Sequence, residues 1–133
     1  MEPRRKMLRA KIHRAVVTDA NLDYEGSLTV PPDLLRAADI MEYEAVNVWN
    51  ITRGTRFETY AIAGVKGSGQ ICVNGAAAHL AGPGEKIIIA AFADVPESTA
   101  GKFRPTIVFV DERNAPVRTG PEIAGPANRR NGC

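Results

Sequence analysis

Aromatic residues are scarce in this chain. Phe, Trp and Tyr make up 6% of its 133 residues, and there is one Trp. Aliphatic side chains and alanine are therefore expected to fill the core. Cysteine is scarcer still, because Cys72 and Cys133 are the two present and they share neither metal-ligand nor redox-motif spacing. This scarcity argues against a disulfide-stapled secreted domain. It favours a cytoplasmic protein in which Cys72 is a buried thiol.

Long apolar runs and a large excess of one charge are also missing. No segment approaches the ~20 apolar residues that span a bilayer, and no apolar stretch follows the basic residues 1–6 as in a secretory signal. The net charge of +2 is too small to indicate a nucleic-acid partner. His13 and His79 stand apart without neighbouring ligands, so no metal site is predicted.

What is present is a series of short alternating apolar segments separated by Gly, Pro, Asn and Asp. They predict strands at 7–17, 28–30, 45–51, 57–63, 70–73, 86–92 and 106–110. Short helices are expected at 32–38 and 76–80, turns at 18–21 and 53–55, and a turn or short helix at 96–101. This pattern predicts a mostly-β fold, a small barrel of about six or seven strands with short helices. Residues 1–6 are expected to be a flexible extension, 7–118 the barrel domain and 119–133 a disordered tail.

The run Tyr24-Glu25-Gly26-Ser27 directly precedes one predicted strand. Gly-Ser is common in turns, so an ordinary turn is the simplest interpretation. The serine hydroxyl can also attack the carbonyl before it, and elimination followed by hydrolysis then leaves an N-terminal pyruvoyl group at residue 27. Gly26 suits such a bond because glycine has no Cβ and tolerates a strained backbone.

Other residues gain a chemical meaning once residue 27 is a ketone that condenses with an amine. Lys11 and Arg56 can bind a substrate carboxylate, or they can be solvated charges. Tyr60 can return a proton to the substrate, or it can be a half-buried strand tyrosine. The run 74–77 can hold a carboxylate on its amide side chain and backbone N–H groups, or it can be a plain helix start. A conventional Ser-His-Asp triad and a phosphate loop are not indicated.

Four segments in this order resemble the pyruvoyl-dependent aspartate decarboxylase family. The likeness runs from about Met7 to about Pro116, and the Tyr-Glu-Gly-Ser and Asn-Gly-Ala-Ala-Ala-His runs are highly specific together. The segments are Met7-Leu8-Arg9-Ala10-Lys11-Ile12-His13-Arg14, Tyr24-Glu25-Gly26-Ser27, Arg56-Phe57-Glu58-Thr59-Tyr60-Ala61-Ile62 and Val73-Asn74-Gly75-Ala76-Ala77-Ala78-His79.

The resemblance implies a double-psi β-barrel, a homotetramer with active sites between protomers, and self-cleavage between Gly26 and Ser27. It also implies decarboxylation of L-aspartate to β-alanine and CO2 through a Schiff base to the pyruvoyl group, as a step of pantothenate biosynthesis. By position, Ser27 is the pyruvoyl precursor and Tyr60 the proton donor. The implied substrate-binding residues are Thr59, Gly75, Ala76, Ala77, Arg56 and Lys11, and the residues that assist cleavage are Thr59 and Asn74.

Two other interpretations stay open at the level of sequence. The order strand, proline, short helix, strand over 27–50 also resembles swapped-hairpin DNA-binding regulators, and the N-terminal basic residues can supply a phosphate-binding face. These residues are Arg4, Arg5, Lys6, Arg9, Lys11 and Arg14. An uncleaved, inactive paralogue with the same barrel is the third interpretation.

Overall fold

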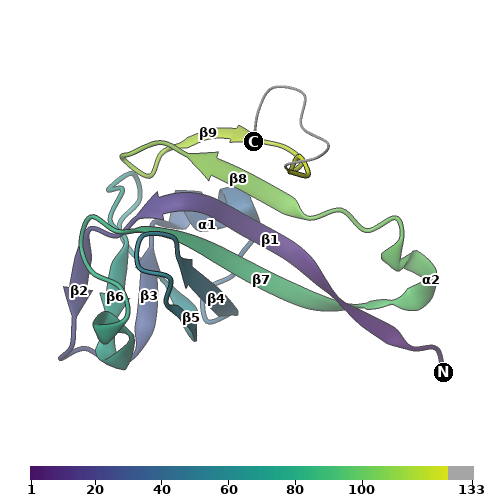
Figure 1. Ribbon diagram of the computed structural model, residues 1–133, viewed down its shortest axis with the longest axis horizontal. Helices are drawn as coiled ribbons and strands as arrows, with labels where there is room; N and C mark the ends of the chain where they lie inside the picture. Colours follow the sequence, from purple (N-terminus) through teal and green to yellow (C-terminus); the bar gives the residue numbers. More distant parts are fainter. Residues whose placement is uncertain (126–133) are drawn as a thin grey trace.

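The computed structural model describes residues 1–125 of the chain (Figure 1). Nine strands form one sheet in the order β2-β6-β3-β5-β4-β7-β1-β8-β9. The strands are β1 (Arg4–Val16), β2 (Asp19–Asn21), β3 (Ser27–Val30), β4 (Ala45–Asn50), β5 (Arg56–Ala63), β6 (Cys72–Asn74), β7 (Lys86–Pro96), β8 (Thr106–Val110) and β9 (Pro116–Thr119). The helices are α1 (Pro32–Ala38), the 3-10 helix η1 (Gly75–His79) and α2 (Glu97–Ala100).

β1 and β7 are the longest strands, and they pair antiparallel along their length. Figure 1 shows them extending together from the body of the fold toward α2. Two register shifts interrupt the pairing, and at the second Arg14 adopts a left-handed φ of 68°. Such bulges bend a strand and let a sheet curl. Parallel pairs join β1 to β8, β2 to β6 and β3 to β5. The mostly-β prediction is confirmed, and this arrangement is consistent with a small β-barrel.

Alternating side chains separate the core from the outer face. Ala10 and Ile12 of β1, Leu28 of β3 and Ala61 of β5 are fully buried in one apolar cluster. Because successive side chains of a strand point to opposite faces, their neighbours Lys11, Ser27 and Tyr60 lie on the other side of the sheet. The core is aliphatic, as the scarcity of aromatic residues predicts.

The α1 helix is the element that its local sequence specifies most fully. Pro32 occupies the first turn, where its missing N–H costs nothing, and Asp33 lies beside it at the positive end of the helix dipole. Asp39 ends the helix in a left-handed conformation with φ of 60°. Leu34 and Leu35 are buried, so the helix is held by its apolar face.

Two short strands were missed, so the predicted number of strands was too low. The predicted turn at 18–21 contains β2, which forms because β6 offers it a parallel partner. Likewise β9 pairs with β8 although all its residues are exposed. Pairing with a neighbouring strand overrides weak β-propensity in such segments.

The two ends of the described chain lie against the barrel. Arg4 to Lys6 of the predicted extension pair with β7, and Arg5 forms an ion pair with Glu97 at 2.7 Å. Of the predicted tail, Thr119 ends β9, residues 120–125 follow it, and Glu122 contacts Lys11. The rest of that tail, 126–133 with Cys133, lies outside the described residues. The domain boundaries and the flexibility of both ends stay predictions.

No helix within residues 1–125 is long and apolar enough to cross a membrane.

Candidate active site

The Gly26–Ser27 bond lies where an exposed bend enters the buried sheet. Tyr24, Glu25 and Gly26 are exposed, whereas Ser27, the first residue of β3, is 7% exposed. The serine hydroxyl therefore lies inside the fold. Gly26 lies in the exposed bend and is joined to a strand only on its C-terminal side. The bond therefore joins an exposed residue to a buried one.

The buried Asn74 side chain connects β6 to the serine. Its amide nitrogen Nδ2 donates to Ser27 Oγ at 2.9 Å and to Thr29 Oγ1 at 3.0 Å. The pairing register explains the contact, because antiparallel β3 and β6 place Ser27 opposite Asn74 and Thr29 opposite Cys72. Asn74 is 3% exposed, so its hydrogen bonds compete little with water. The structure thus brings the Asn74 amide against the Ser27 hydroxyl, and the role of Asn74 in cleavage stays a prediction.

Gly75 packs directly against Gly26, the residue before Ser27. Its φ is +72°, and a Cβ at this position would lie 2.8 Å from both Cα and N of Gly26 and 3.0 Å from the Tyr24 carbonyl oxygen. Glycine is therefore needed here for its backbone conformation and for the close approach. At Gly26 itself φ is outside the left-handed region, and an added Cβ would meet nothing within 4 Å. In this conformation the close approach that requires glycine is therefore at Gly75, and the expectation that Gly26 leaves its carbonyl open to attack stays a prediction.

Thr59 and Tyr60 approach the same bond from β5. β3 and β5 run parallel with Leu28 paired to Ala61, so extending the register by one residue sets Tyr60 beside Ser27. One residue further, Thr59 is level with Gly26. Both side chains are half-buried, and the Tyr60 ring lies 6.4 Å from that of Tyr43. Strand alternation puts Tyr60 on the same side of the sheet as Ser27 and Thr59 on the core side.

The run after Asn74 forms the 3-10 helix η1. Ala76 is exposed and Ala77 is half-buried with its methyl group against the core cluster. No side chain caps the start of η1. The helix directly follows the hydrogen-bonded Asn74. The substrate-binding role of Gly75, Ala76 and Ala77 stays a prediction.

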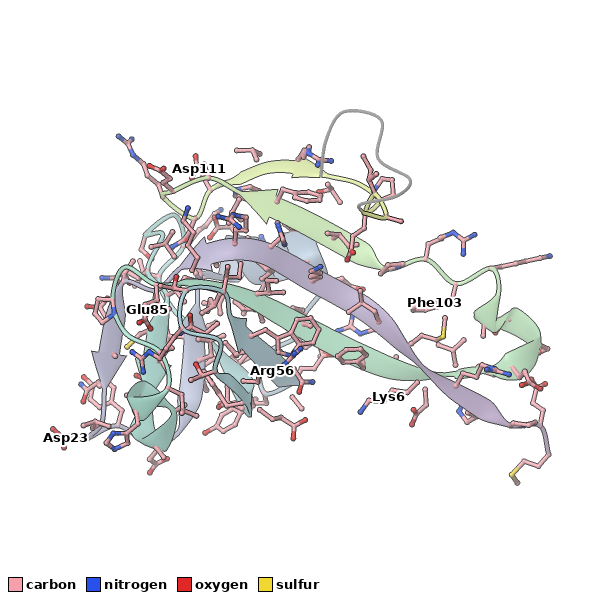
Figure 2. All side chains as sticks on the ribbon, in the orientation of Figure 1. Lys6, Asp23, Arg56, Glu85, Phe103 and Asp111 are labelled. Atoms are coloured by element: carbon pink, nitrogen blue, oxygen red, sulfur yellow. The ribbon has the colours of Figure 1, made fainter. Side chains whose placement is uncertain are left out.

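Arg56 begins β5, four residues before Tyr60 and on the same face of the strand. Its guanidinium lies 4.8 Å from the ring centroid of Trp49, a cation–π distance. The side chain is exposed, and Figure 2 shows it at the β4–β5 pair. Arg56, Tyr60 and Ser27 therefore share one face of the sheet.

Lys11 is a predicted site residue that lies far from Ser27 in the strand order of the sheet. It lies on β1, which is separated from β3 by β7, β4 and β5 in the sheet order. Its Nζ pairs with Glu122 Oε1 at 2.8 Å, and its side chain is 13% exposed. Residues of the same groove include His13 and Phe109, whose rings meet edge to face at 5.5 Å. Burial, together with nearby cations, lowers the pKa of His13.

Sequence reasoning missed two polar residues of the site. Thr29 accepts a hydrogen bond from Asn74, and Cys72 Sγ donates to Asn74 Oδ1 at 3.0 Å. Alternation gives the available signal, since residues 27 and 29, like 72 and 74, must face the same way in a strand. Burial raises the pKa of the Cys72 thiol, and the Asp19 carboxylate raises it further. The thiol is therefore protonated at neutral pH.

No group of three or more His, Cys, Asp or Glu side chains within residues 1–125 is arranged to hold a metal ion.

Comparisons with known proteins agree with the resemblance. A protein from Legionella pneumophila strain Lens named aspartate 1-decarboxylase is 61% identical over 125 residues, which cover 94% of each chain. Proteins of the same name from Rhodopirellula baltica and Myxococcus xanthus are 60% and 59% identical, covering 93% and 95% of this chain and 80% and 98% of theirs. The sequence profile described as aspartate decarboxylase matches residues 3–117. The chain therefore belongs to the aspartate decarboxylase family.

Proposed function

We propose that this chain is an aspartate 1-decarboxylase that converts L-aspartate to β-alanine and CO2 with a pyruvoyl group made from its own Ser27. The observation that carries the proposal is the buried Asn74 amide bonded to Ser27 Oγ at 2.9 Å, beside a Gly75 that packs on Gly26. A plain turn needs neither contact. Family membership supplies the substrate, because the relatives are named for aspartate.

Self-cleavage begins when Ser27 Oγ attacks the Gly26 carbonyl carbon. The C–N bond breaks, the nitrogen takes the hydroxyl proton, and an ester joins Gly26 to the Ser27 side chain. A base then removes the Cα proton of residue 27 and the Cβ–Oγ bond breaks, which releases Gly26 as a carboxylate and leaves dehydroalanine. Water adds to the tautomeric imine, ammonia leaves, and residue 27 becomes a pyruvoyl group.

The neighbours of the bond fit these steps. The Asn74 Nδ2–H group stabilises negative charge on Oγ when it leaves as part of the Gly26 carboxylate. Thr59, which the β3–β5 register extended by two residues sets level with Gly26, is proposed to donate to the carbonyl oxygen as it becomes tetrahedral. Gly75 keeps the Gly26 backbone close to both groups. This arrangement supports the assignment of Gly26, Ser27, Thr59 and Asn74 to self-processing.

The pyruvoyl group supplies a ketone that condenses with the substrate amine and withdraws electrons from the Cα–carboxylate bond. The α-carboxylate leaves as neutral CO2, so an ion pair to it would stabilise the ground state and slow the reaction. We therefore assign Arg56 to the retained β-carboxylate, which a guanidinium can bind through two parallel hydrogen bonds. Tyr60, on the same face beside residue 27, then protonates the α-carbon. Pocket length must reject glutamate, because one methylene alone gives only ~1–3 kcal/mol.

The proposed assembly is a homotetramer whose active sites lie between protomers. In one chain three strands lie between that of Lys11 and that of Ser27 in the sheet order, which fits a site to which a second protomer contributes its Lys11. The remaining parts of the proposal are binding of substrate by Thr59, Gly75, Ala76 and Ala77, a cytoplasmic location and a role in pantothenate biosynthesis. All of these rest on the family resemblance rather than on geometry.

The DNA-binding alternative is less well supported by the charges of β1. Of its six candidate phosphate-binding residues, Arg5 pairs with Glu97, Arg9 with Glu44 and Lys11 with Glu122. Carboxylates that already neutralise these cations would have to be displaced by phosphates. For the uncleaved paralogue, the retention of Tyr60, Arg56 and Asn74 is the contrary observation.

Release of β-alanine from L-aspartate by the purified full chain tests the proposal. The matched pair is Ser27→Ala against Thr29→Ala, because both remove one hydroxyl that Asn74 contacts and one of them bears the reacting oxygen. We expect activity from the native chain, reduced activity from Thr29→Ala and none from Ser27→Ala. Activity that persists in Ser27→Ala would refute the proposal.

A further inference from the structure

The side-chain amide of an asparagine can adopt two orientations that exchange its oxygen and its nitrogen. At Asn74 the orientation decides which of these two atoms faces the Ser27 hydroxyl. With Nδ2 toward β3, the amide donates to Ser27 Oγ and Thr29 Oγ1. With the amide turned over, Oδ1 would face the two hydroxyls and accept their protons. The hydroxyls can act as donors or acceptors, so they do not select one orientation. The selecting contact must come from the other end of the amide.

That contact is the thiol of Cys72. The antiparallel register sets Cys72 opposite Thr29 and Asn74 opposite Ser27, so the four side chains form a rectangle on one face of β3 and β6. Cys72 Sγ lies 3.0 Å from Asn74 Oδ1. A thiol is both a weak donor and a weak acceptor; in the structure it donates, to Oδ1. The thiol thus favours the orientation that turns Nδ2 toward Ser27.

We propose that Cys72 is a positioning residue for self-cleavage, which fixes the Asn74 amide so that its nitrogen donates to Ser27 Oγ. The inference rests on the proposed self-cleavage and adds a residue to it. Its mechanistic content is the direction of one hydrogen bond. When Nδ2 donates, Ser27 keeps its own proton free for the departing Gly26–Ser27 nitrogen, and Oγ is stabilised when it leaves as carboxylate.

The orientation matters because the opposite one would change both steps. An amide oxygen facing Ser27 would hold the hydroxyl proton away from the nitrogen that must receive it. It would also put a partial negative charge beside the Gly26 carboxylate as it forms. A flipped or tilted Asn74 therefore slows cleavage without unfolding the barrel, since both ends of the amide keep some partner.

The test follows cleavage of freshly purified full-length precursor by intact mass against time. Cys72→Ala and Cys72→Val remove the donor, with Val also filling the space of the thiol, and Cys72→Ser restores a donor. We expect Ala and Val to slow cleavage by about threefold to tenfold, the range for loss of one hydrogen bond. Ser should cleave faster than both. Thermal unfolding of each precursor reports whether packing has changed.

A double-mutant cycle with Asn74→Ala separates positioning from packing. If Cys72 acts through Asn74, Cys72→Ala has no further effect on the cleavage rate once Asn74 is alanine. Equal rates for native, Ala and Val precursors, a Ser variant as slow as Ala, or additive effects in the cycle would each overturn the inference. If the native precursor itself never cleaves, the proposed function fails and this inference fails with it. If the native chain cleaves and Cys72→Ala cleaves at the same rate, the inference about Cys72 fails and the proposed function stands.

Discussion

Gly75→Ala is the substitution whose effect the structure specifies best. The new Cβ would lie 2.8 Å from Gly26 Cα and N, whereas atoms in ordinary contact are about 3.5–4.0 Å apart. The segment before Ser27 must therefore retreat by about 0.7 Å or more. A misplacement of ~1 Å in a reacting group can cost ~100-fold in rate. We expect cleavage of Gly75→Ala precursor to be slower than native by roughly that factor.

The backbone conformation of Gly75 adds a cost that must be separated from the clash. Left-handed φ costs an L-residue ~1–2 kcal/mol, and overpacking adds ~1–3 kcal/mol. Gly67→Ala is the matched control, because Gly67 has the same φ of +72° and an added Cβ there meets nothing within 4 Å. Both variants should lose stability in thermal unfolding, with the larger loss in Gly75→Ala.

The assay is a time course of precursor and cleaved chains by denaturing mass spectrometry, run well below the melting temperature of each variant. Gly67→Ala should cleave at the native rate. If Gly75→Ala and Gly67→Ala cleave equally fast, the close approach of Gly75 to Gly26 has no part in the reaction, and the reasoning is wrong.

Two further predictions concern specificity and acid stability. Arg56→Ala should lower kcat/KM for L-aspartate by about 10–100-fold, the range for loss of a hydrogen bond to a charged group. It should lower kcat/KM much less for a substrate without the β-carboxylate. Equal impairment of both substrates would refute the assignment of Arg56. The Gly82 N–H and the Asn50 amide lower the pKa of Glu85 below its ordinary 4.5. The stability that Glu85 contributes is therefore present above pH 4.5 and lost as the pH falls through the lowered pKa. The difference in melting temperature between native and Glu85→Gln protein should therefore decrease as the pH falls through the lowered pKa of Glu85. A constant difference from pH 7 to pH 3 would contradict this prediction.

Local patterns specify the elements that need no distant partner. Pro32 and Asp33 open α1 by their own geometry, and Gly54, with φ of 83°, makes the turn between β4 and β5. The fold class followed from such elements. β2 and β9 were not predicted because each depends on pairing with another strand rather than on an alternation in its own sequence. Their sequences are short and polar, so no apolar face marks them as strands.

The candidate site shows the same division between local and distant information. The Gly26–Ser27 bond and the run after Asn74 are recognisable in sequence, but 47 residues separate Ser27 from Asn74 and only the β3–β6 register brings them together. The same register sets Cys72 opposite Thr29, which gives a lone thiol a polar partner next to the serine. Glu122 is 111 residues from Lys11 and lies in a segment that composition predicts to be disordered. Contacts of this kind depend on the assembled sheet.

The central claim is that Ser27 cuts the bond before it and becomes the reactive ketone. Intact mass of the purified full chain under denaturing conditions, before and after borohydride treatment, tests it most directly. We predict a short chain that ends at Gly26 and a long chain lighter, by one ammonia, than simple hydrolysis would leave, with borohydride adding two hydrogens to the long chain. A single uncleaved mass after prolonged incubation, or a long chain that begins with unmodified serine, would contradict the claim.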